Sequence, residues 1–325
     1  MEMQFLVSLI LYPFKFLFLF LLLNEYKNSE LRQKLPPGPW KLPVLGNLHQ
    51  LIGLRSLPHH ALKTLAQKYG PIMSIKLGDL QTIVVSSPNI AKKITKTNDV
   101  AFADRVDLMI AKIVLYNSSD IASTPYGEYW RQMRKLCVLE FLNHKKVRSF
   151  HSLMENEVLR LVDSVRVSEG FPINLTEMIL SVECRIICRS TVGRVWKVDQ
   201  ESLLIQIIKE AVSIAGVFNF ADVFPSMKFL HCLSAGSKRR LEKMHDKIDC
   251  VLEDIIQQHE EKRVSSGSGD QSMEVEDIVD VLLRVSERKD LQVPITRDNI
   301  KANIFVSILF HLLFFSYVYQ CVSAV

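Results

Sequence analysis

The feature that most constrains this chain is an apolar stretch near its N-terminus, Met3 to Leu23, in which 17 of 21 residues are apolar. As a helix, a segment of this length extends about 31 Å, which matches the hydrocarbon core of a bilayer. Lys15 lies inside the stretch and costs about 3 kcal/mol at the membrane centre, but the Leu, Ile, Val and Phe residues together contribute roughly −7 kcal/mol. The sequence therefore predicts an N-terminal transmembrane helix over residues 1–23.

A cleavable signal peptide is the alternative for this stretch. Such a peptide has a basic start and small residues at its cleavage site, whereas this chain begins with Glu2 and continues after Leu23 with Asn24-Glu25-Tyr26-Lys27. The basic residues that follow the stretch are Lys27, Arg32, Lys34 and Lys41. Because positive charge marks the cytoplasmic side, we expect a retained anchor with the body of the protein on the cytoplasmic face. The sequons at Asn117 and Asn174 are then expected to carry no glycan.

Residues 24–43 are interpreted as a linker that contains a proline-rich hinge. Four prolines occur within eight residues, in the run Pro36-Pro37-Gly38-Pro39-Trp40-Lys41-Leu42-Pro43. Proline removes a backbone donor and fixes φ, so the run favours a stiff, extended segment over a helix. A rigid spacer between the anchor and a globular body is the functional interpretation, and an ordinary loop is the alternative.

The composition of the 325-residue chain indicates a helix-rich globular body. It is 48% hydrophobic and 9% aromatic, which excludes a disordered chain, and its 12 glycines exclude a collagen-like one. The net charge of +5 is small for this length and does not indicate a nucleic-acid-binding surface. Six cysteines without a CxxC pair do not make a disulfide scaffold, and Cys184 and Cys188, four residues apart, are expected to pack in the core.

Apolar periodicity predicts a mainly helical body over residues 44–302 with one small β-hairpin. Residues 58–69 have helical spacing, and alternation in 71–77 and 81–86 around a turn at Gly78 predicts the hairpin. Pro88 opens a further helix that runs to about residue 96. Amphipathic stripes predict later helices within residues 147–165, 203–214, 237–255 and 277–285.

The segment 303–325 is interpreted as a divergent hydrophobic tail. Its last 22 residues, 304–325, contain no Asp, Glu, Lys or Arg, and Arg297 and Lys301 precede them. A stretch of this length can cross a bilayer. Three alternatives are open: a second membrane span, a buried central helix and a non-native tail.

Few motifs in the sequence carry recognisable chemistry. The patterns GxGxxG, GxxxxGK, HExxH and GxSxG do not occur. The informative stretch runs from Pro125 to Lys135, because its helical part places Trp130 and Arg134 four residues apart on one face. An indole N–H and a guanidinium fork suit a carboxylate on a flat, apolar ligand. On spacing alone, a cation–π pair on a helix surface is the alternative.

Five stretches, taken together and in order, give the chain a resemblance to a known family. They are Pro36-Pro37-Gly38-Pro39, Gly46-Asn47-Leu48-His49, Phe102-Ala103-Asp104-Arg105, Tyr129-Trp130-Arg131-Gln132-Met133-Arg134-Lys135 and Asn219-Phe220-Ala221-Asp222-Val223-Phe224-Pro225. With the anchor before them, the chain resembles the N-terminal part of plant membrane-bound cytochrome P450s, most of all the members that oxidise sesquiterpenes. The similarity extends to about Ile300. The resemblance implies an incomplete cytochrome P450 fold, mainly α with a small β-sheet.

The resemblance also implies roles for particular residues. In the family, the positions of Arg105, Trp130 and Arg134 hold haem propionates. An apolar substrate site is expected to be lined by Met109, Ile110, Tyr116, Val212, Ala215 and Phe218. A basic face is expected near the docking surface for NADPH–cytochrome P450 reductase, with a solvated helix face as the alternative. Its residues are Arg131, Lys135, Lys145 and Lys146.

The sequence departs from the family after Ile300. The family's oxygen-activation helix carries Ala/Gly-Gly-x-Asp/Glu-Thr, whereas this chain reads Lys301-Ala302-Asn303-Ile304-Phe305. The haem loop FxxGxRxCxG has no counterpart, ExxR occurs only upstream of its expected place, and no cysteine is followed by glycine two residues later. The thiolate ligand of the iron is therefore absent, and we assign no catalytic or metal-binding residue.

These features lead to one functional prediction and one alternative. The full-length relative would be a monooxygenase that hydroxylates an apolar, terpenoid-like plant secondary metabolite with haem, O2 and electrons from NADPH. It would lie in the endoplasmic reticulum membrane, with lipid, the reductase and the apolar small molecule as partners and no nucleic acid. This chain alone is expected to be inactive. The alternative is a non-catalytic, membrane-anchored binding or interaction protein.

Overall fold

The computed structural model describes residues 35–52, 57–193, 206–207, 210–211, 219–227, 232, 234–266, 276–288 and 290–309. The chain divides into two compact units, Met1–Phe102 with Phe220–Leu233, and Ala103–Asn219 with Ser234–Val325. The predicted anchor, residues 24–34 of the linker and residues 310–325 of the tail lie outside the described residues. Within the described part, no helix combines the length and apolar composition that a membrane crossing requires.

The first unit contains the predicted β-hairpin. Strands β1 (Ile72–Leu77) and β2 (Leu80–Val85) are antiparallel, with Ile72 opposite Val85 and Leu77 opposite Leu80. Gly78 turns the chain with a φ of 59°, in the left-handed region that favours glycine. A Cβ at Gly78 would also lie 2.5 Å from the Val223 carbonyl oxygen, so the turn requires glycine for its close approach as well.

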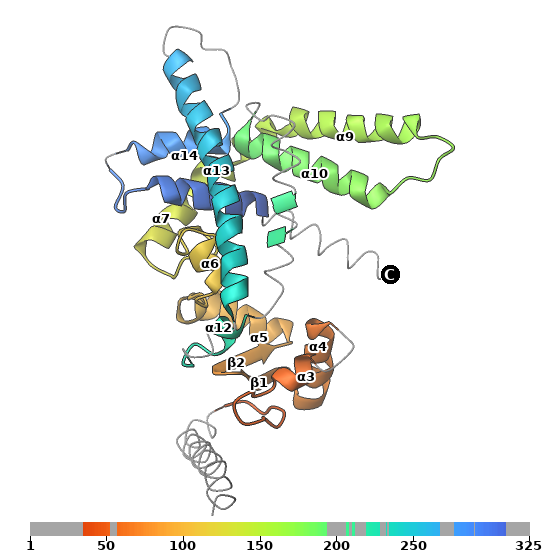
Figure 1. Ribbon diagram of the computed structural model, residues 1–325, viewed down its shortest axis with the longest axis vertical. Coiled ribbons are helices and arrows are strands. Elements are labelled where there is room, and N and C mark those ends of the chain that lie inside the picture. The colour runs from red at the N-terminus through yellow and green to blue at the C-terminus, as the bar shows by residue number, and fades with distance from the viewer. Residues whose placement is uncertain are drawn as a thin grey trace, which may run out of the picture. The chain divides into compact units, whose positions relative to one another are not determined.

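Short helices surround the hairpin in this unit. They are α3 (Leu48–Ile52), α4 (Pro58–Tyr69), α5 (Pro88–Lys92), a π-helical turn (Lys93–Thr97), a 3-10 turn (Asp99–Phe102) and α12 (Phe220–Val223). The sequence predicted α4 with its observed bounds, because Pro58 suits a first helical position and the apolar spacing ends at Tyr69. Figure 1 shows α3 and α4 beside β1, where Leu51, Ala61 and Ile75 form a small core.

The described part of the proline-rich hinge lies along β1. The Ser74 amide donates to the Pro37 carbonyl at 2.9 Å, and a Cβ at Gly38 would lie 1.9 Å from the Ser74 carbonyl oxygen. The buried Asn47 side chain donates to the Trp40 carbonyl at 2.8 Å and accepts from the Lys76 amide at 2.8 Å. Residues 35–43 are therefore fixed to the sheet by hydrogen bonds as well as stiffened by their prolines.

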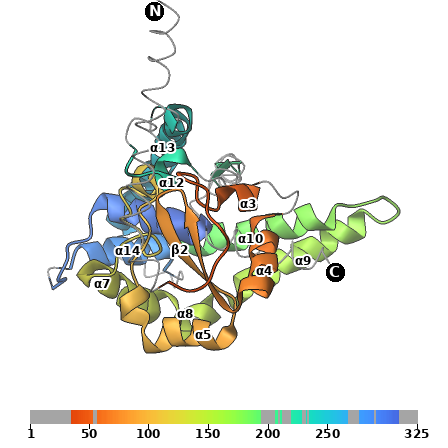
Figure 2. The same ribbon diagram turned by 90° about the horizontal axis from the view of Figure 1, so that it is seen from below.

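The second unit is helical. Its elements are α6 (Met109–Ile113), α7 (Glu128–Leu136), a π-helical turn (Cys137–Phe141), α8 (His144–Ser149), α9 (His151–Val167), α10 (Leu175–Val192), α13 (Ala235–Ser266) and α14 (Ile278–Ser286), and residues 297–309 are also helical. Figures 1 and 2 show α9 and α10 as an extended helical pair, and Figure 1 shows α13 as the long helix of this unit. The chain is thus mainly α with one two-stranded sheet, as the sequence predicts.

The longest predicted stripe is confirmed as core. All six of its apolar residues on α13 are at most 5% exposed: Leu241, Met244, Ile248, Val251, Leu252 and Ile255. They belong to one cluster with α14 and with residues of the last described helix, such as Phe305 and Ile308. The core of this unit therefore lies along α13.

The stripe predicted for residues 147–165 gives a different result. The helical segment is present, but it is divided at Phe150 into α8 and α9, and the only buried residue of α9 is Glu157. Val158 is 48% exposed and Met154 39%. The predicted helical segment is thus observed, but its apolar residues are half-buried or exposed, because the charged Glu157 occupies the buried side of the helix.

The last described helix continues through the start of the expected tail. Residues 300–306, 308 and 309 are buried, so the boundary expected between 302 and 303 falls inside a buried helix. Arg297 forms ion pairs with Glu253 and Glu260 at 2.7 Å each, and Lys301 pairs with Asp249 at 2.6 Å. For residues 304–309 the structure therefore matches the buried-helix alternative.

Candidate functional site

Trp130 and Arg134 lie on one face of α7, as their spacing predicts. The Arg134 guanidinium carbon is 5.1 Å from the centre of the Trp130 ring. The centre of the Tyr126 ring, four residues before Trp130, lies 5.4 Å from the same ring centre. Trp130 is half-buried and Arg134 is exposed. The face therefore offers an indole N–H and a charged guanidinium to a ligand, and the two side chains also form the cation–π pair that was the alternative.

The opposite side of α7 is fixed to the last part of the second unit. Met133 and Leu136 are buried in the main core. The Gln132 amide group donates to the Val293 carbonyl at 2.6 Å and accepts from the Val293 amide at 3.1 Å. The Tyr129 hydroxyl donates to the Ser119 carbonyl at 2.5 Å. These contacts hold the helix so that the Trp130 and Arg134 face stays outward.

Asn303 completes this positioning. It is 5% exposed, and its amide nitrogen donates to the Tyr129 hydroxyl at 3.3 Å and to the Asn299 carbonyl at 2.7 Å. Its carbonyl oxygen accepts from the Ile121 amide at 3.1 Å. Burial raises the pKa of Tyr129 to about 12, so its hydroxyl keeps the proton that it donates. Sequence reasoning missed Asn303, and its signal was a lone amide inside an apolar run.

Arg105, the third predicted cofactor residue, is turned toward its own loop. Its Nε donates to the Ala122 carbonyl at 3.0 Å and one terminal nitrogen, Nη1, donates to the Ala103 carbonyl at 2.5 Å. These bonds brace the loop across residues 103–122. The structure therefore joins Trp130 and Arg134 on one face and shows Arg105 as a brace of the neighbouring loop.

A cavity of about 680 Å³ lies between this loop and residues 293–299. Its lining is mixed, and its polar residues include Arg105, Asp107, Lys112, Ser119, Thr124 and Asn299. Beside it, Tyr116, Asn117 and Ser118 have successive positive φ angles of 51°, 59° and 58°. Three such residues in a row are a strained turn, which persists only where its surroundings hold it. The charged residues in this lining set it apart from the apolar substrate site that the resemblance implies.

Of the six predicted substrate-lining residues, the structure describes three. Met109, Ile110 and Tyr116 are partly buried against the main core, and none of them lines the polar cavity. The Tyr116 hydroxyl donates to the Asp249 carboxylate at 2.8 Å, and burial together with this bond raises the pKa of Tyr116. Val212, Ala215 and Phe218 lie outside the described residues.

Only part of the predicted basic face is exposed to solvent. Arg131, Lys135 and Lys145 are exposed. The Lys146 ammonium instead donates to the Glu276 carbonyl, and burial lowers the pKa of Lys146 despite nearby carboxylates. Three of the four predicted charges therefore face solvent, and the fourth links α8 to the residue before Asp277.

The described cysteines do not fit the iron of a haem group. Burial raises the pKa of the Cys137 thiol to about 11, so it does not offer a thiolate at neutral pH. Cys184 and Cys188 are buried in the core as predicted, with their sulfur atoms 3.9 Å apart. Cys232 and Cys250 are exposed. The residues of α7 thus fit the carboxylate side of such a ligand, whereas Cys137, Cys184 and Cys188 do not offer a sulfur ligand to its metal.

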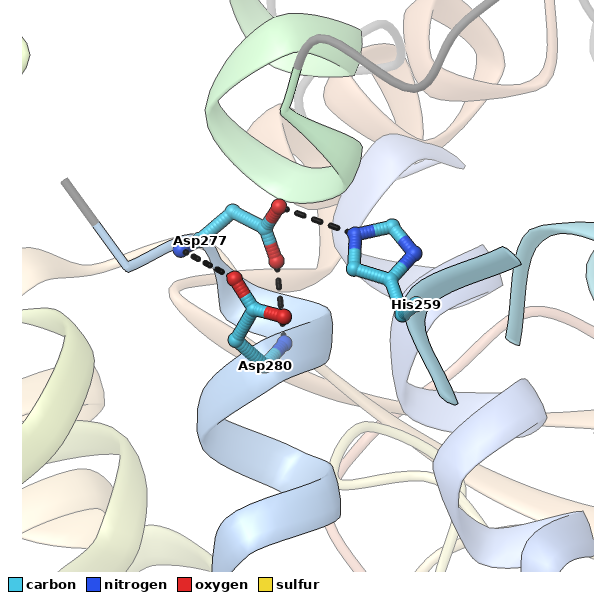
Figure 3. Close-up of side chains that lie close together, drawn as sticks. All are labelled: His259, Asp277 and Asp280. Carbon is cyan, nitrogen blue, oxygen red and sulfur yellow. Dashed lines mark hydrogen bonds and ion pairs between the residues drawn. The ribbon is translucent and has the colours of Figure 1, made fainter. Parts of the chain in front are cut away.

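A second group of polar side chains lies away from α7. His259, Asp277 and Asp280 place a ring nitrogen and two carboxylates within 4.8 Å of one another (Figure 3). The His259 Nε2 atom is 2.9 Å from the Asp277 carboxylate. Sequence reasoning missed this group because His259 and Asp277 belong to different helices.

Comparisons with known proteins cover this region of the chain. A profile of the family Cytochrome P450 matches residues 36–309, which extends beyond Ile300, where the resemblance was expected to end. Premnaspirodiene oxygenase of Hyoscyamus muticus is 50% identical over 293 residues, which are 90% of this chain and 57% of that protein. The 5-epiaristolochene 1,3-dihydroxylase of Nicotiana tabacum is 46% identical over 294 residues, again 90% and 57%.

A solved structure agrees in fold. The structure of a zebra fish cytochrome P450 with progesterone superposes with a TM-score of 0.59 at 17% identity, over 78% of this chain and 56% of that one. At this identity the likeness shows the fold alone. The chain therefore spans a little over half the length of the relatives it matches.

Proposed function

The chain belongs to the cytochrome P450 family, and on this premise we propose that it is part of a haem-dependent monooxygenase of plant secondary metabolism. Family membership implies haem as the cofactor. The names of two relatives, premnaspirodiene oxygenase and 5-epiaristolochene 1,3-dihydroxylase, support oxygenation of an apolar, terpenoid-like metabolite. In this reaction one oxygen atom of O2 enters a C–H bond as a hydroxyl and the other leaves as water, with two electrons and two protons consumed.

The observation that carries the proposal is the outward face of α7. Trp130 and Arg134 would each donate a hydrogen bond to a propionate, worth about 1.5–3 kcal/mol for a bond to a charged group. Arg105 already uses Nε and Nη1 to brace its loop, so its Nη2 is the atom proposed to reach a propionate. When bound, haem supplies oxygen activation, while these side chains hold and orient it.

The iron ligand is the part of the site that this chain does not supply among its described residues. We propose that the thiolate comes from the length of sequence that the relatives have beyond their match to this chain. The 325-residue chain alone is then expected to take up haem weakly and to be inactive, since propionate contacts do not replace an iron–sulfur bond and an enclosing apolar wall.

A fusion experiment tests this proposal. The part of premnaspirodiene oxygenase that follows the match is joined after Leu309, and the reduced protein is treated with carbon monoxide. The fusion is expected to show the thiolate-type Soret band, whereas the 325-residue chain shows none. A thiolate band from the unextended chain would contradict the proposal, because one of its own cysteines would then be the ligand.

The role of α7 needs a matched pair of variants in the fusion. Arg134→Ala is expected to lower haem retention at least tenfold, which corresponds to about 1.4 kcal/mol. Arg131→Ala removes an equal charge from the same helix, where the guanidinium lies over Tyr126 rather than Trp130, and is expected to keep haem. Equal haem retention by both variants would remove Arg134 from the proposed site.

We also propose a place and partners for the complete enzyme. The apolar residues 3–23 and the basic residues after them support an anchor in the endoplasmic reticulum membrane with the body in the cytosol. Exposed Arg131, Lys135 and Lys145 support docking of NADPH–cytochrome P450 reductase on that side. Lipid, the reductase and the apolar substrate are thus the proposed partners.

Glycosylation tests the proposed topology. Asn117 and Asn174 lie in sequons, and a cytosolic body carries no glycan at either. The Asn174 side chain accepts from the Glu177 amide at 3.3 Å as the N-cap of α10, so a glycan there would also disturb the start of a helix. The protein expressed in microsomes is expected to show no mass change on glycosidase treatment, and a shift at either site would reverse the orientation.

A further inference from the structure

Three helices of the second unit meet at the carboxylate of Asp277. Asp277 is the N-cap of α14, where its Oδ1 accepts from the Asp280 amide at 2.9 Å and the Asp280 side chain accepts in return from the Asp277 amide. Its Oδ2 lies so near the end of α10 that a Cβ on Gly193 would be 2.4 Å from it. From α13, His259 reaches the same Oδ2. One side chain therefore joins the start of α14 to two other helices.

The ring of His259 has an acceptor at each nitrogen. Its Nδ1 is 2.8 Å from the Ile255 carbonyl oxygen, and its Nε2 is 2.9 Å from Asp277 Oδ2. A carbonyl cannot donate, so both contacts are hydrogen bonds only when the ring nitrogens carry two protons. The side chain is 1% exposed, so water cannot replace a lost bond. Loss of one proton would leave a ring lone pair facing an oxygen lone pair inside the protein, which is unfavourable.

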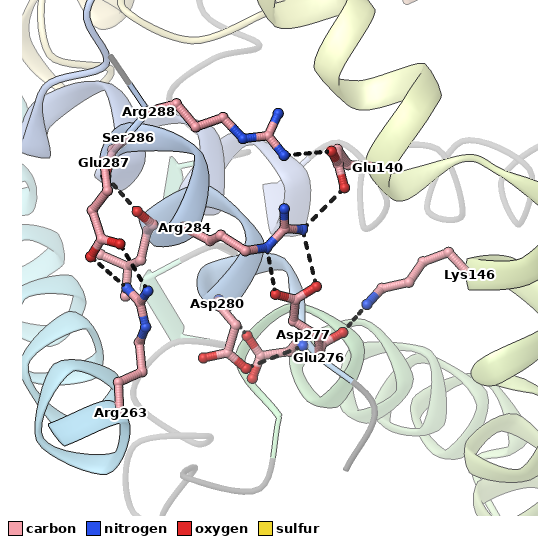
Figure 4. Close-up of polar contacts among 11 residues, drawn as sticks. Glu140, Lys146, Arg263, Glu276, Asp277, Asp280, Arg284, Ser286, Glu287 and Arg288 are labelled. Carbon is pink, nitrogen blue, oxygen red and sulfur yellow. Dashed lines mark hydrogen bonds and ion pairs between the residues drawn. The ribbon is translucent and has the colours of Figure 1, made fainter. Parts of the chain in front are cut away.

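Charged groups around the junction favour the doubly protonated ring. The Asp280 carboxylate lies beside that of Asp277 at the start of α14 (Figure 3). The positive charge of Lys262 on α13 favours the ionised form of Asp280, against the effects of burial and of the Asp277 charge. Figure 4 shows the basic groups of the neighbouring segment directed to other partners: Arg284 pairs with Glu276 at 2.8 Å and with Glu140 at 3.1 Å, and Lys146 donates to the Glu276 carbonyl. Burial alone would lower the pKa of His259, but the bond to Asp277 and the charges of Asp277 and Asp280 outweigh it and raise the pKa.

A metal ion is a poorer occupant of this junction than a proton. The three side chains are of types that bind metals, but their atoms are already engaged by one another and by backbone amides. A metal at His259 Nε2 would need the lone pair of that nitrogen, and a metal between the carboxylates would compete with the capping bonds of α14. The geometry is that of a closed ion pair.

We propose that His259 and Asp277 form a pH-sensitive latch, closed while the ring holds two protons, which keeps the first turn of α14 against α13 and the end of α10. The contact between His259 and Asp277 also links two residues that are 18 positions apart, on either side of the segment that connects α13 to α14. Releasing it frees the N-cap carboxylate, so the capping box and the packing on Gly193 loosen together. This inference does not depend on the proposed function.

The direction of the pH dependence follows from the raised pKa. An unfolded histidine titrates near pH 6.5, and the folded state of this one holds its proton to higher pH. The stabilisation is therefore fully present below about pH 6.5 and is lost as pH rises through the pKa of folded His259. The contact between His259 and Asp277 is therefore expected to break as pH rises.

Amide hydrogen exchange in the full chain measures the latch directly. The reporters are the amides of Asp280 and Val281, which bond to the Asp277 side chain and carbonyl. After correction for intrinsic exchange, their protection is expected to fall by up to tenfold for each unit of pH between about 6.5 and the pKa of folded His259, and to level off above that pKa, since opening releases one proton in this range. His259→Gln removes this dependence, whereas His151→Gln, at an exposed position on α9, keeps it. Protection that does not vary with pH in the unmodified chain overturns the proposal.

A second measurement covers the case in which His259→Gln fails to fold. The pKa of His259 is read by NMR from the labelled ring in the unmodified chain and in Asp280→Asn, which removes a charge and keeps a side-chain oxygen for the cap. The substitution is expected to lower the pKa by about one unit, a tenfold loss of proton affinity. An unchanged pKa, or stoichiometric uptake of Zn²⁺ with loss of the ring proton, contradicts the latch.

Discussion

Two helices of the second unit, α9 and α13, have the same kind of sequence but different surroundings. Each carries an apolar stripe at helical spacing. On α13 the stripe is fully buried in one cluster with α14 and residues 300–309. On α9 none of the stripe is buried: Leu153 and Leu161 are half-buried, and Val158 is 48% exposed, as is its neighbour Val162. The same periodicity therefore ends in a core on one helix and at a surface on the other.

The buried position of α9 shows what replaces the stripe. Glu157 is fully buried, with its carboxylate bonded to Arg189 at 2.5 Å and to Arg185 at 3.0 Å, both from α10. Burial alone would raise the pKa of Glu157, but these two guanidinium groups outweigh it and lower the pKa. The contact of α9 with α10 is thus built around a charge, whereas the contacts of α13 are built around apolar side chains.

The largest expected effect comes from removing a methionine from each helix. Met244 on α13 is 1% exposed and Met154 on α9 is 39% exposed. Met244→Ala is expected to lower the free energy of unfolding by about 2–5 kcal/mol, because a cavity forms in a packed core. Met154→Ala is expected to change it by less than about 1 kcal/mol. Urea unfolding of both variants checks the contrast, and similar losses would mean that the α9 stripe is covered in solution.

A smaller effect is expected from Glu157→Gln, which removes the charge at the α9–α10 contact. The loss is about 1–3 kcal/mol, since bonds to charged groups are broken but the arginines remain about a third exposed. Because the folded pKa of Glu157 is lowered, this stabilisation is present above its ordinary value near 4.5 and is lost as pH falls through the lower folded value. The exposed Glu155→Gln, two residues away, serves as the control, and an equal loss in both variants rejects the contribution of the buried charge.

The sequence predicts the local elements of this fold better than their burial. The hairpin around Gly78, helix α4 and the α13 stripe follow from turn chemistry and periodicity that act within a few residues. Burial of the α9 stripe depends on what packs against it, and no local pattern encodes that. On α9 the buried position is taken by Glu157, whose partners on α10 lie 28 and 32 residues away.

In the candidate site, too, the local arrangement could be predicted from the sequence, whereas the long-range contacts could not. The i,i+4 spacing of Trp130 and Arg134 was enough to place both on one face of α7. The contacts that hold α7 were not predictable, because Gln132 bonds to Val293 across 161 residues and Asn303 bonds to Tyr129 across 174. Asn303 also lies in the stretch that the sequence assigned to a divergent tail. A helix face is a local property, and its attachment to the protein is a long-range one.

The smallest expected effect on stability, and the sharpest test of the comparison, comes from the exposed stripe itself. Val158 and Val162 are four residues apart on the same face of α9 and are equally exposed. The double substitution Val158→Ser and Val162→Ser is expected to change the free energy of unfolding by no more than about 0.5 kcal/mol per site, as for surface positions generally. Because contiguous exposed apolar side chains promote association, the same change is expected to reduce self-association.

Light scattering over a concentration series measures this association, with Glu155→Gln again as the control on the same helix. A lower apparent mass for the double variant at unchanged urea midpoint is the expected result. If the midpoint falls as far as it does for Met244→Ala, the two valines are buried in solution and the distinction between α9 and α13 fails. If stability and association are both unchanged, the stripe is exposed but too small to bind another molecule, and the comparison holds for burial alone.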